Sequence, residues 1–360
     1  MITLKIASLF SGIGGFEEGF KKSKMKHSVV FSSEIDKYAI LTYGSNFQTK
    51  YMHGDIKKID EKDIPDHDLL CAGFPCQSFS VAGKQKGFND IRGTLFFDVV
   101  RIIKYKKPKF IFLENVKNLI SHDESNTIKT ILKNISDCGY TFDFTIINSN
   151  EAGVPQSRER TYIVGVLNGL VEKFDSDKRS QKVSEIKKWA NNSNLNTMNF
   201  FNNICFNKKT KHIIDVLETN VDEKYFIKNH RLDEYLKKNI YNFNQKAERK
   251  IIKEFDLPRE IHNDLERQRR VYSIYGISPT LLARSDSPKI ILNSNNVFSI
   301  RKLTPFETLR IQGFDKKYVE NVKKIGMSDT QLYKQAGNAV SPPVITEIIN
   351  CIMEMFNEEI

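Results

Sequence analysis

The sequence predicts an α/β fold built on a mostly parallel sheet, together with a second, smaller domain. Short apolar runs alternate with amphipathic stretches over the first 170 residues, which is the pattern of βαβ units. After Leu167 this pattern decays into the asparagine-rich segment 191–207. A chain of 360 residues also exceeds what one hydrophobic core usually supports. We therefore expect a large domain from 1–170 and 325–360, and a small domain with its hinge from 171–324.

The expected strands of the large domain are apolar runs rich in β-branched and aromatic residues. They are separated by segments with turn residues or helical periodicity. These runs lie near residues 4–10, 28–33, 67–72, 109–113 and 161–166.

Two helices near the C-terminus carry clear start signals. Thr304 is a predicted N-cap, Glu307 completes a capping box, and Gly313 ends the helix. A last helix is expected to begin at Ser341, before two prolines, and to run to about Asn357. Its apolar stripe should pack on the large domain.

Composition limits the classes of partner. No apolar run approaches the ~20 residues that span a membrane, and the N-terminus reads as a first strand, so we expect a cytoplasmic protein. Five cysteines without zinc-ligand spacing argue against disulfides and a metal site. A net charge of +11 favours a polyanionic partner, and the basic surplus is concentrated in residues 171–300. A solvated lysine-rich surface is an equal interpretation of that surplus.

A cofactor site is predicted where the first strand ends in LFSGIGGF, residues 9–16, because its glycines permit a tight turn and close approach of a ligand. Glu34 ends the next strand, where a carboxylate can accept hydrogen bonds from ribose hydroxyls. Asp55 follows a third strand edge and could contact an adenine amino group. Taken alone, Asp55 would be interpreted as a helix cap.

Cys76 differs from the other cysteines in its position. It follows the predicted strand DLLCAGF, at the carboxyl end where open α/β sheets bind ligands. Glu114 ends another strand, so its carboxylate should emerge at the same edge. Arg158 and Arg160 precede the strand TYIVGVL and could hold a phosphate or orient a carboxylate, although surface charge is the simpler interpretation of each alone. The remaining cysteines are expected to be small buried hydrophobic residues.

The segment between Cys76 and Leu95 is polar and contains glycines at 83, 87 and 93. Connections in compact domains usually take about 4–6 residues, so a loop this long beside a candidate nucleophile is expected to be a mobile lid.

The motifs in this order resemble those of the DNA cytosine-5 methyltransferases, most closely the short bacterial restriction-modification enzymes. The resemblance covers most of the chain outside residues 171–260. Its motifs are LFSGIGGF (9–16), SSEID (32–36), GDI (54–56), GFPCQSFS (73–80), RGTLFFD (92–98), ENV (114–116), QSRER (156–160), RKLTPFETLRIQGF (301–314) and YKQAGNAV (333–340). Three positions depart from the family pattern: Ser8, Ile35 and Ala339.

The resemblance implies a Rossmann-like methyltransferase domain with a smaller target-recognition domain. In that chemistry Cys76 attacks C6 of a flipped cytosine, Glu114 contacts N3, and C5 becomes able to take a methyl group from S-adenosylmethionine. A covalent adduct is needed because C5 of an aromatic pyrimidine is only weakly nucleophilic. Arg158 and Arg160 would support catalysis.

The resemblance also assigns the binding residues. The S-adenosylmethionine pocket would comprise Phe10, Gly12, Ile13, Gly14, Gly15, Glu34, Ile35, Asp55, Pro75, Leu95, Asn338 and Val340. Contacts with double-stranded DNA would come from Ser80, Lys84, Arg92, Arg270, Thr280 and Leu281. Trp189 and several tyrosines are expected in the small-domain core. We expect a monomer without metal, and a companion endonuclease acting on the same site is compatible with this family.

Three other functions remain as alternatives. An RNA cytosine-5 methyltransferase on the same scaffold would carry a CFT signature, whereas Cys205 lies in ICFNK. A catalytically silent DNA-binding relative would not need Cys76 and Glu114. An amino-group methyltransferase would carry an Asn- or Asp-Pro-Pro-aromatic string, and the one Pro-Pro pair follows Ser341 at a helix start.

Overall fold

The computed structural model describes residues 3–75, 95–206, 208–239, 247, 249–294 and 297–356. The chain forms two compact units. Unit 1 comprises 1–148, 159–206 and 344–360, and unit 2 comprises 149–158 and 207–343. This division lies elsewhere than the boundaries expected near 170 and 325, because residues 171–206 pack on the large sheet and residues 325–343 belong to unit 2.

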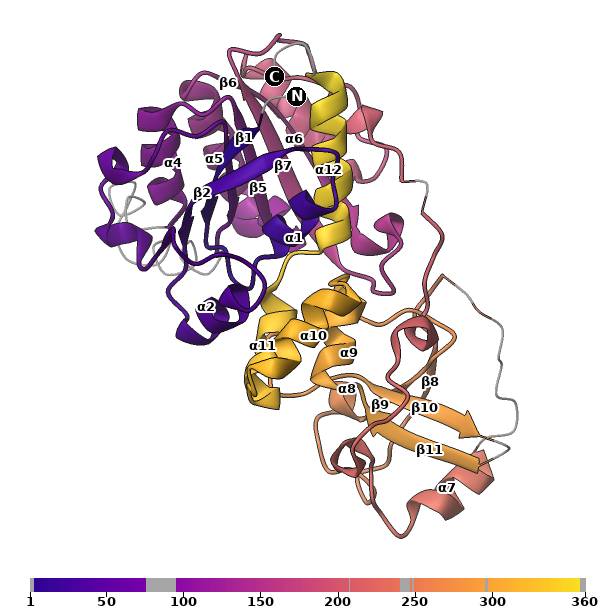
Figure 1. Ribbon diagram of the computed structural model, residues 1–360. Helices are drawn as coiled ribbons and strands as arrows, with labels where there is room; N and C mark the ends of the chain where they lie inside the picture. The colour runs from indigo at the N-terminus through magenta and orange to yellow at the C-terminus, as the bar shows by residue number, and fades with distance from the viewer. Residues whose placement is uncertain are drawn as a thin grey trace, which may run out of the picture. The chain divides into compact units, whose positions relative to one another are not determined.

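Unit 1 contains a sheet in the order β3-β2-β1-β4-β5-β7-β6 (Figure 1). The strands from β3 to β5 are parallel, and β7 runs antiparallel between β5 and β6. The mostly parallel α/β fold predicted from the sequence is confirmed. Strand β3 ends directly before Gly54, at the third strand edge that was expected there, whereas β6 was not among the predicted strands. The strands are β1 Leu4–Leu9, β2 His27–Ser33, β3 Met52–His53, β4 Leu69–Gly73, β5 Phe110–Val116, β6 Tyr140–Asn148 and β7 Glu159–Leu167.

Helices cover both faces of this sheet (Figure 1). On β5, Ile111 and Leu113 join the core formed with α4 (Leu95–Lys106) and α5 (Asn126–Asp137). Phe112 packs edge-on against Phe16 of α1 (Gly15–Lys21) on the opposite face. Phe110, also on that face, packs against Phe356 after α12 (Pro342–Met355). Side chains that alternate along a strand thus serve two separate layers. The remaining helix before β3 is α2 (Lys37–Gly44).

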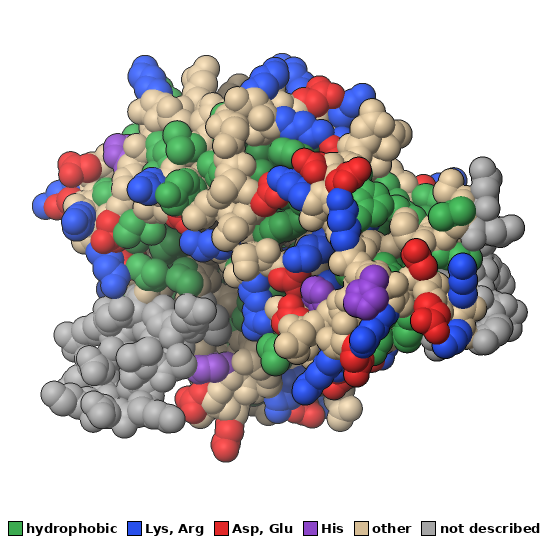
Figure 2. All heavy atoms as spheres, turned by 90° about the horizontal axis from the view of Figure 1, so that it is seen from below, with side chains coloured by type: hydrophobic (Ala, Val, Ile, Leu, Met, Phe, Trp, Pro, Cys, Tyr) green, Lys and Arg blue, Asp and Glu red, His purple; other side chains and the backbone are tan. Residues whose placement is uncertain are grey.

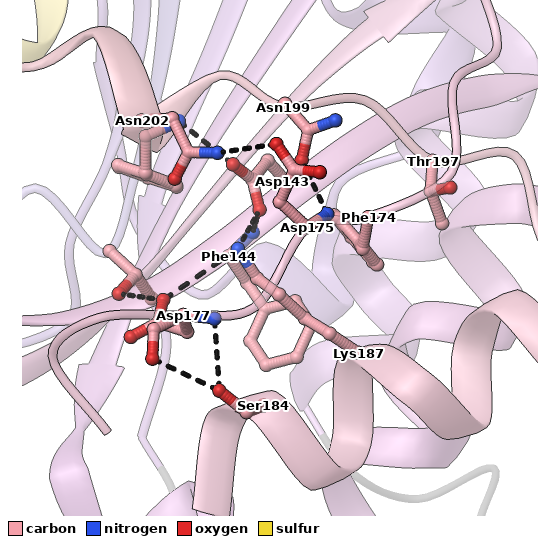
Figure 3. A network of polar contacts seen from close by, with 12 residues as sticks. Asp143, Phe144, Phe174, Asp175, Asp177, Ser184, Lys187, Thr197, Asn199 and Asn202 are labelled. Carbon is pink, nitrogen blue, oxygen red and sulfur yellow. Dashed lines mark hydrogen bonds and ion pairs between the residues drawn. The ribbon is translucent and has the colours of Figure 1, made fainter. Parts of the chain in front are cut away.

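Segment 171–206 belongs to unit 1 through a buried polar network at β6 (Figure 3). Lys187 of α6 (Gln181–Asn192) lies 2.8 Å from Asp143 and 3.6 Å from Asp177, and its side chain is 2% exposed. The ammonium group also lies 4.8 Å from the Phe174 ring centroid. Trp189, on the same helix, packs against the core of unit 1, so the prediction of a small-domain role for it was wrong.

Unit 2 contains a four-stranded sheet in the order β11-β10-β9-β8, which the sequence did not predict. Helix α7 (Leu232–Asn239) shares one apolar cluster with it, including Leu236 and Ile291. A second cluster includes Ile290 and Ile311. The other elements are β8 Lys253–Asp256, α8 Glu266–Arg269, β9 Arg270–Ser273, β10 Lys289–Ser294, β11 Val297–Lys302, α9 Pro305–Gln312, α10 Lys316–Lys324 and α11 Asp329–Asn338.

Helix α9 begins as its sequence predicts. Thr304 accepts a hydrogen bond from the Glu307 backbone N–H, and Glu307 accepts one from that of Thr304, which confirms the capping box. Gly313 ends the helix with φ 104°, a conformation that favours glycine. The Arg301 guanidinium makes two 2.7 Å hydrogen bonds to the Glu307 carboxylate, and both residues are buried.

Candidate functional site

The turn between β1 and α1 has a backbone that few residues adopt. Phe10 has φ 54° although it is not glycine, and Gly12 and Gly14 have φ values of 56° and 84°. A Cβ atom added at Gly14 would lie 2.3 Å from the Phe47 ring, so a side chain has no room there. Strained non-glycine residues such as Phe10 concentrate at binding sites.

Glu34 fixes this turn relative to β2. Its carboxylate accepts hydrogen bonds from the N–H groups of Gly12, Ile35 and Asp36, each at 2.8 Å. The turn and the two strand ends line a cavity of about 190 Å³. Its lining residues are Phe10, Ser33, Glu34, Ile35, Gly54, Asp55, Ile56, Lys57 and Leu95.

The cavity brings together five of the predicted cofactor residues: Phe10, Glu34, Ile35, Asp55 and Leu95. Ile35 is 73% exposed, so an apolar surface is open to a ligand. Asp55 also caps the short helix after it, accepting from the Lys57 N–H at 3.1 Å, which confirms its interpretation as a cap, whereas its contact with adenine stays a prediction.

The sequence prediction omitted four residues of this lining: Ser33, Gly54, Ile56 and Lys57. Each is a direct neighbour of a predicted residue or lies two positions from one. The signal that could have found them is the strand end itself, because every residue at a carboxyl edge is close to a ligand bound there.

The other predicted cofactor residues occupy different places. Gly12, Ile13, Gly14 and Gly15 form the turn and the start of α1. Pro75 follows β4. Asn338 ends α11, and Val340 follows it, in unit 2.

A buried carboxyl lies on α1 behind the turn. Glu17 is 2% exposed, and the Tyr43 hydroxyl donates to its Oε1 at 3.4 Å. Burial raises the pKa of Glu17 to about 7, with Ser8 and Tyr43 opposing the shift. Burial, and then the charge of Glu17, raise the pKa of the Cys71 thiol. Cys71 is therefore an inert core thiol.

Glu114 and Arg160 meet at the carboxyl edge of the sheet in unit 1. Arg160 Nε lies 3.3 Å from Glu114 Oε1, and both side chains are largely buried. Asn115, next to Glu114, donates to the backbone carbonyl of Phe74 at 2.8 Å. Gly73, the last residue of β4, pairs with Glu114. The chain leading to Cys76 is thereby held beside the Glu114–Arg160 pair up to Pro75.

Arg158 lies in unit 2 and is directed at backbone groups. Its guanidinium donates to the carbonyls of Leu281, Gly337 and Ala339 at 3.3, 3.0 and 2.8 Å. The Leu281 side chain is buried in the apolar cluster of unit 2. Thr280 is half-buried and donates to the Ser157 carbonyl at 2.6 Å.

A second cavity, of about 160 Å³, lies in unit 2 and has a basic lining. Arg267, Arg270, Arg284 and Lys289 contribute to it, against one carboxylate, Asp286. Arg270 is paired with Glu266 at 3.0 Å, whereas Arg267 and Arg284 are exposed. Figure 2 shows that Lys and Arg side chains are interspersed with Asp and Glu on the face it presents. The net charge alone therefore does not identify the surface that would bind a polyanionic partner.

Comparison with known proteins decides the family. Residues 4–354 match the C-5 cytosine-specific DNA methylases. The chain belongs to this family. It is 40% identical to the type II methyltransferase M1.ScrFI of Lactococcus lactis subsp. cremoris, over 98% of this chain and 79% of that protein. It is 36% identical to the type II methyltransferase M.HhaI of Haemophilus parahaemolyticus, over 94% of this chain and 90% of that protein.

Solved structures agree on the fold of this DNA methylase. A methyltransferase of Entamoeba histolytica superposes with a TM-score of 0.68 at 18% identity, over 99% of both chains. The Dnmt2 methyltransferase of S. pombe gives 0.65 at 18% identity, over 99% of this chain and 100% of that chain. The protein thus has the Rossmann-like methyltransferase fold predicted from its sequence, and its family implies methylation of DNA from S-adenosylmethionine.

Some predicted residues of this methylase lie outside the described part of the chain. These are the nucleophile and three DNA contacts: Cys76, Ser80, Lys84 and Arg92, with the rest of the predicted lid. Of the other cysteines, Cys71 and Cys351 are buried as predicted and Cys138 is partly so, but Cys205 is exposed and that prediction was wrong.

Two further predictions concern membranes and metals. No helix in the described ranges combines the length and apolar character needed to cross a membrane. Among the described residues, no three His, Cys, Asp or Glu side chains are grouped so as to hold a metal ion.

Proposed function

We propose that this methylase transfers a methyl group to C5 of a flipped cytosine within a specific double-stranded DNA sequence, with Cys76 as the covalent nucleophile. The observation that carries the proposal is the Glu114–Arg160 pair at the carboxyl edge of the sheet, beside the strand end that leads to Cys76. The cofactor cavity opens from the same unit. The strand end that precedes Cys76, the Glu114 carboxyl and the cavity thus lie at one sheet edge, where α/β enzymes bind their ligands.

The cavity fits S-adenosylmethionine in its chemistry. Glu34 can accept hydrogen bonds from ribose hydroxyls, and Asp55 from an adenine amino group. The exposed face of Ile35 suits the adenine ring. Two carboxylates against the single Lys57 also favour a ligand with a sulfonium charge. When bound, this cofactor supplies an electrophilic methyl group.

The residues of the chain carry the remaining chemistry. The Cys76 thiolate forms a bond to C6 as the C5–C6 double bond opens, and the Glu114 carboxyl group donates its proton to N3, so that no net charge builds up on the ring. Arg160 orients the Glu114 carboxyl through its 3.3 Å contact. C5, now nucleophilic, takes the methyl group. Loss of the C5 proton to water and cleavage of the bond between Cys76 and C6 then restore the C5–C6 double bond. Cys76 leaves as thiolate and N3 returns its proton to Glu114, so the enzyme is regenerated.

The names of two relatives support a proposal for the biological role. M1.ScrFI and M.HhaI are named type II methyltransferases. We place this protein as the monomeric modification enzyme of a restriction-modification system, with a companion endonuclease acting on the same sequence. Unit 2, with its basic cavity, would contact the DNA.

The test is transfer of label from methyl-tritiated S-adenosylmethionine to duplex DNA, followed by chromatography of the nucleosides. We expect the label in 5-methyl-deoxycytidine, its complete loss in Cys76→Ser, and normal transfer by Cys205→Ser, which changes an exposed thiol. Label found only on tRNA, in N4-methylcytosine, or still transferred by Cys76→Ser would contradict the proposal.

A further inference from the structure

In unit 2, residues 156–158 form hydrogen bonds with residues 278–281, which lead into the basic cavity. The Leu281 N–H donates to the Gln156 side-chain oxygen at 3.0 Å, and the Leu281 carbonyl accepts from Arg158. The Ser157 N–H donates to the Ser278 carbonyl at 2.8 Å. Residues 156–158 therefore hold residues 278–281 through backbone groups, irrespective of the side chains that those residues carry.

The side-chain amides of Gln156 and Gln312 extend this hydrogen-bond network. Gln156 Nε2 donates to Gln312 Oε1 at 2.7 Å, and Gln312 Nε2 donates to the Ala339 carbonyl at 2.7 Å and to Ser341 Oγ at 3.2 Å. Both glutamines are completely buried. A buried amide has few alternative partners, so each of these bonds restricts the geometry of the next.

The backbone beyond Leu281 is held from another side. A Cβ atom at Gly337 would lie 2.2 Å from the carbonyl carbon of Leu282 and 2.3 Å from the Ala283 nitrogen. Since this contact is with backbone, it cannot be relieved by turning a side chain. The Gly337 carbonyl in turn accepts a hydrogen bond from Arg158, so one guanidinium links the backbone at Gly337 to the backbone at Leu281.

Residues 278–281 lead directly into the basic cavity. Thr280, Leu282 and Arg284 line it, and Asp286 and Lys289 follow within the next five residues. Arg284 is exposed, and an arginine there can bond the edge of a guanine with two parallel hydrogen bonds. Such a contact discriminates between bases only if the backbone beneath the side chain is fixed.

We propose that the Gln156–Gln312 amide pair is a positioning device for sequence discrimination. This inference rests on the proposed function. The pair, with Arg158 and Gly337, fixes the backbone of residues 280–283 and so sets where the cavity meets the edges of the bases. Neither glutamine needs to touch DNA or S-adenosylmethionine. The pair therefore affects the choice of DNA sequence and not the affinity for the cofactor.

The experiment compares wild type with Gln312→Met, which keeps the length of the side chain and removes all three amide bonds. A pool of duplexes randomised around a cytosine is methylated, and bisulfite sequencing gives the rate at the preferred sequence relative to sequences with one base pair changed. We expect that ratio to fall by about tenfold, because a displaced backbone should lose the selectivity that contact with one base pair provides. The KM for S-adenosylmethionine should stay at the wild-type value.

Three further variants complete the test. Gln181→Met changes an exposed glutamine of unit 1 and should retain the wild-type ratio. Ser341→Ala removes only the 3.2 Å bond and should reduce the ratio by about threefold, which tests the inference even if Gln312→Met does not fold. Gln156→Met combined with Gln312→Met should cost less than the sum of the two single changes, because the bond between the two amides is lost in each of them.

The outcomes separate the two proposals. If wild type yields no 5-methylcytosine in the pool, the proposed function fails. If wild type methylates a preferred sequence while Ser341→Ala and any folded Gln312→Met variant keep the wild-type ratio, the positioning inference alone is overturned. A loss in Gln312→Met that appears only as a weaker KM for S-adenosylmethionine, or additive losses in the double variant, would also overturn it.

Discussion

Glu17 is the residue whose protonation should link stability to pH. Its pKa is raised from 4.5 to about 7 by burial, so between these values the folded chain binds a proton that the unfolded chain has released. Stability therefore falls as pH rises through this window and levels off above it. The size of the effect is on the order of 3 kcal/mol, from the free energy per unit of pKa.

We expect Glu17→Gln to remove this dependence. As the pH is raised from about 5 to about 8, the free energy of unfolding of the variant should rise relative to that of wild type by up to about 3 kcal/mol. Urea unfolding at the two pH values measures it, with the exposed Glu172→Gln as control. A constant difference between Glu17→Gln and wild type would show that Glu17 does not titrate in this range.

Lys187 tests the buried network at β6 (Figure 3). Burial raises the pKa of Asp143, and the neighbouring Lys187 charge opposes that rise. Lys187→Met leaves Asp143 buried without its cation, which should cost about 3–5 kcal/mol of unfolding free energy. Lys188→Met, at an exposed position one residue away, should change it little. Equal effects of the two substitutions would argue against a structural role for the network.

Individual site residues were predictable where they follow a strand. Glu34 and Glu114 were found because the carboxyl ends of parallel strands share an edge, and both lie at that edge. The partners of Lys187 were not predictable, since Asp143 is distant in sequence and nothing local marks a buried pair. Ser8, which departs from the family pattern, lies beside the buried Glu17.

Helix α9 begins at a boundary that is held by both a capping box and a buried ion pair. Glu307 caps the helix and also neutralises Arg301, so one buried carboxylate serves two purposes. Arg301→Met should destabilise this element by about 3–5 kcal/mol, because the carboxylate then lacks its partner. Hydrogen exchange of the α9 amides should accelerate, whereas Lys302→Met should leave it unchanged. Unaltered exchange in Arg301→Met would contradict this assignment.

Elements with local signals were predicted and elements defined by distant pairing were not. The α9 cap and the proline-led start of α12 are encoded in neighbouring residues. Strand β6 was missed although Tyr140, Phe142 and Phe144 alternate, because its Asp143 suggests an exposed face. The four-stranded sheet of unit 2 joins segments separated by long loops, and its short strands leave little periodicity to detect.

The whole chain carries a net charge of +11, so its affinity for DNA should depend on the salt concentration. Binding should weaken as salt increases, because phosphate contacts release counterions. Arg267→Gln, at an exposed arginine of the basic cavity, should lower the magnitude of the slope of log K against log salt by about 1, as expected for a phosphate contact. Arg259→Gln, an exposed arginine outside the cavity, is the matched control. Equal slopes for wild type and Arg267→Gln would exclude Arg267 from contact with phosphates.

At this scale the division of the chain could be predicted only in part. A second domain was expected from length and from the loss of periodicity after Leu167. Residues 171–206 nevertheless belong to unit 1, because Val183 and Ile186 of α6 join its core. An asparagine-rich composition predicts irregular backbone, but it does not indicate which core that backbone covers.

The central claim is a covalent bond between Cys76 and C6 of cytosine, and it can be tested with duplex DNA that contains 5-fluorocytosine. Fluorine replaces the C5 proton that must leave, so the adduct should persist after methyl transfer. Mass spectrometry of the digested complex should place the modified nucleotide on the Cys76 peptide, only when S-adenosylmethionine is present. Methylation of normal DNA without any trapped adduct, or an adduct on another residue, would contradict the claim.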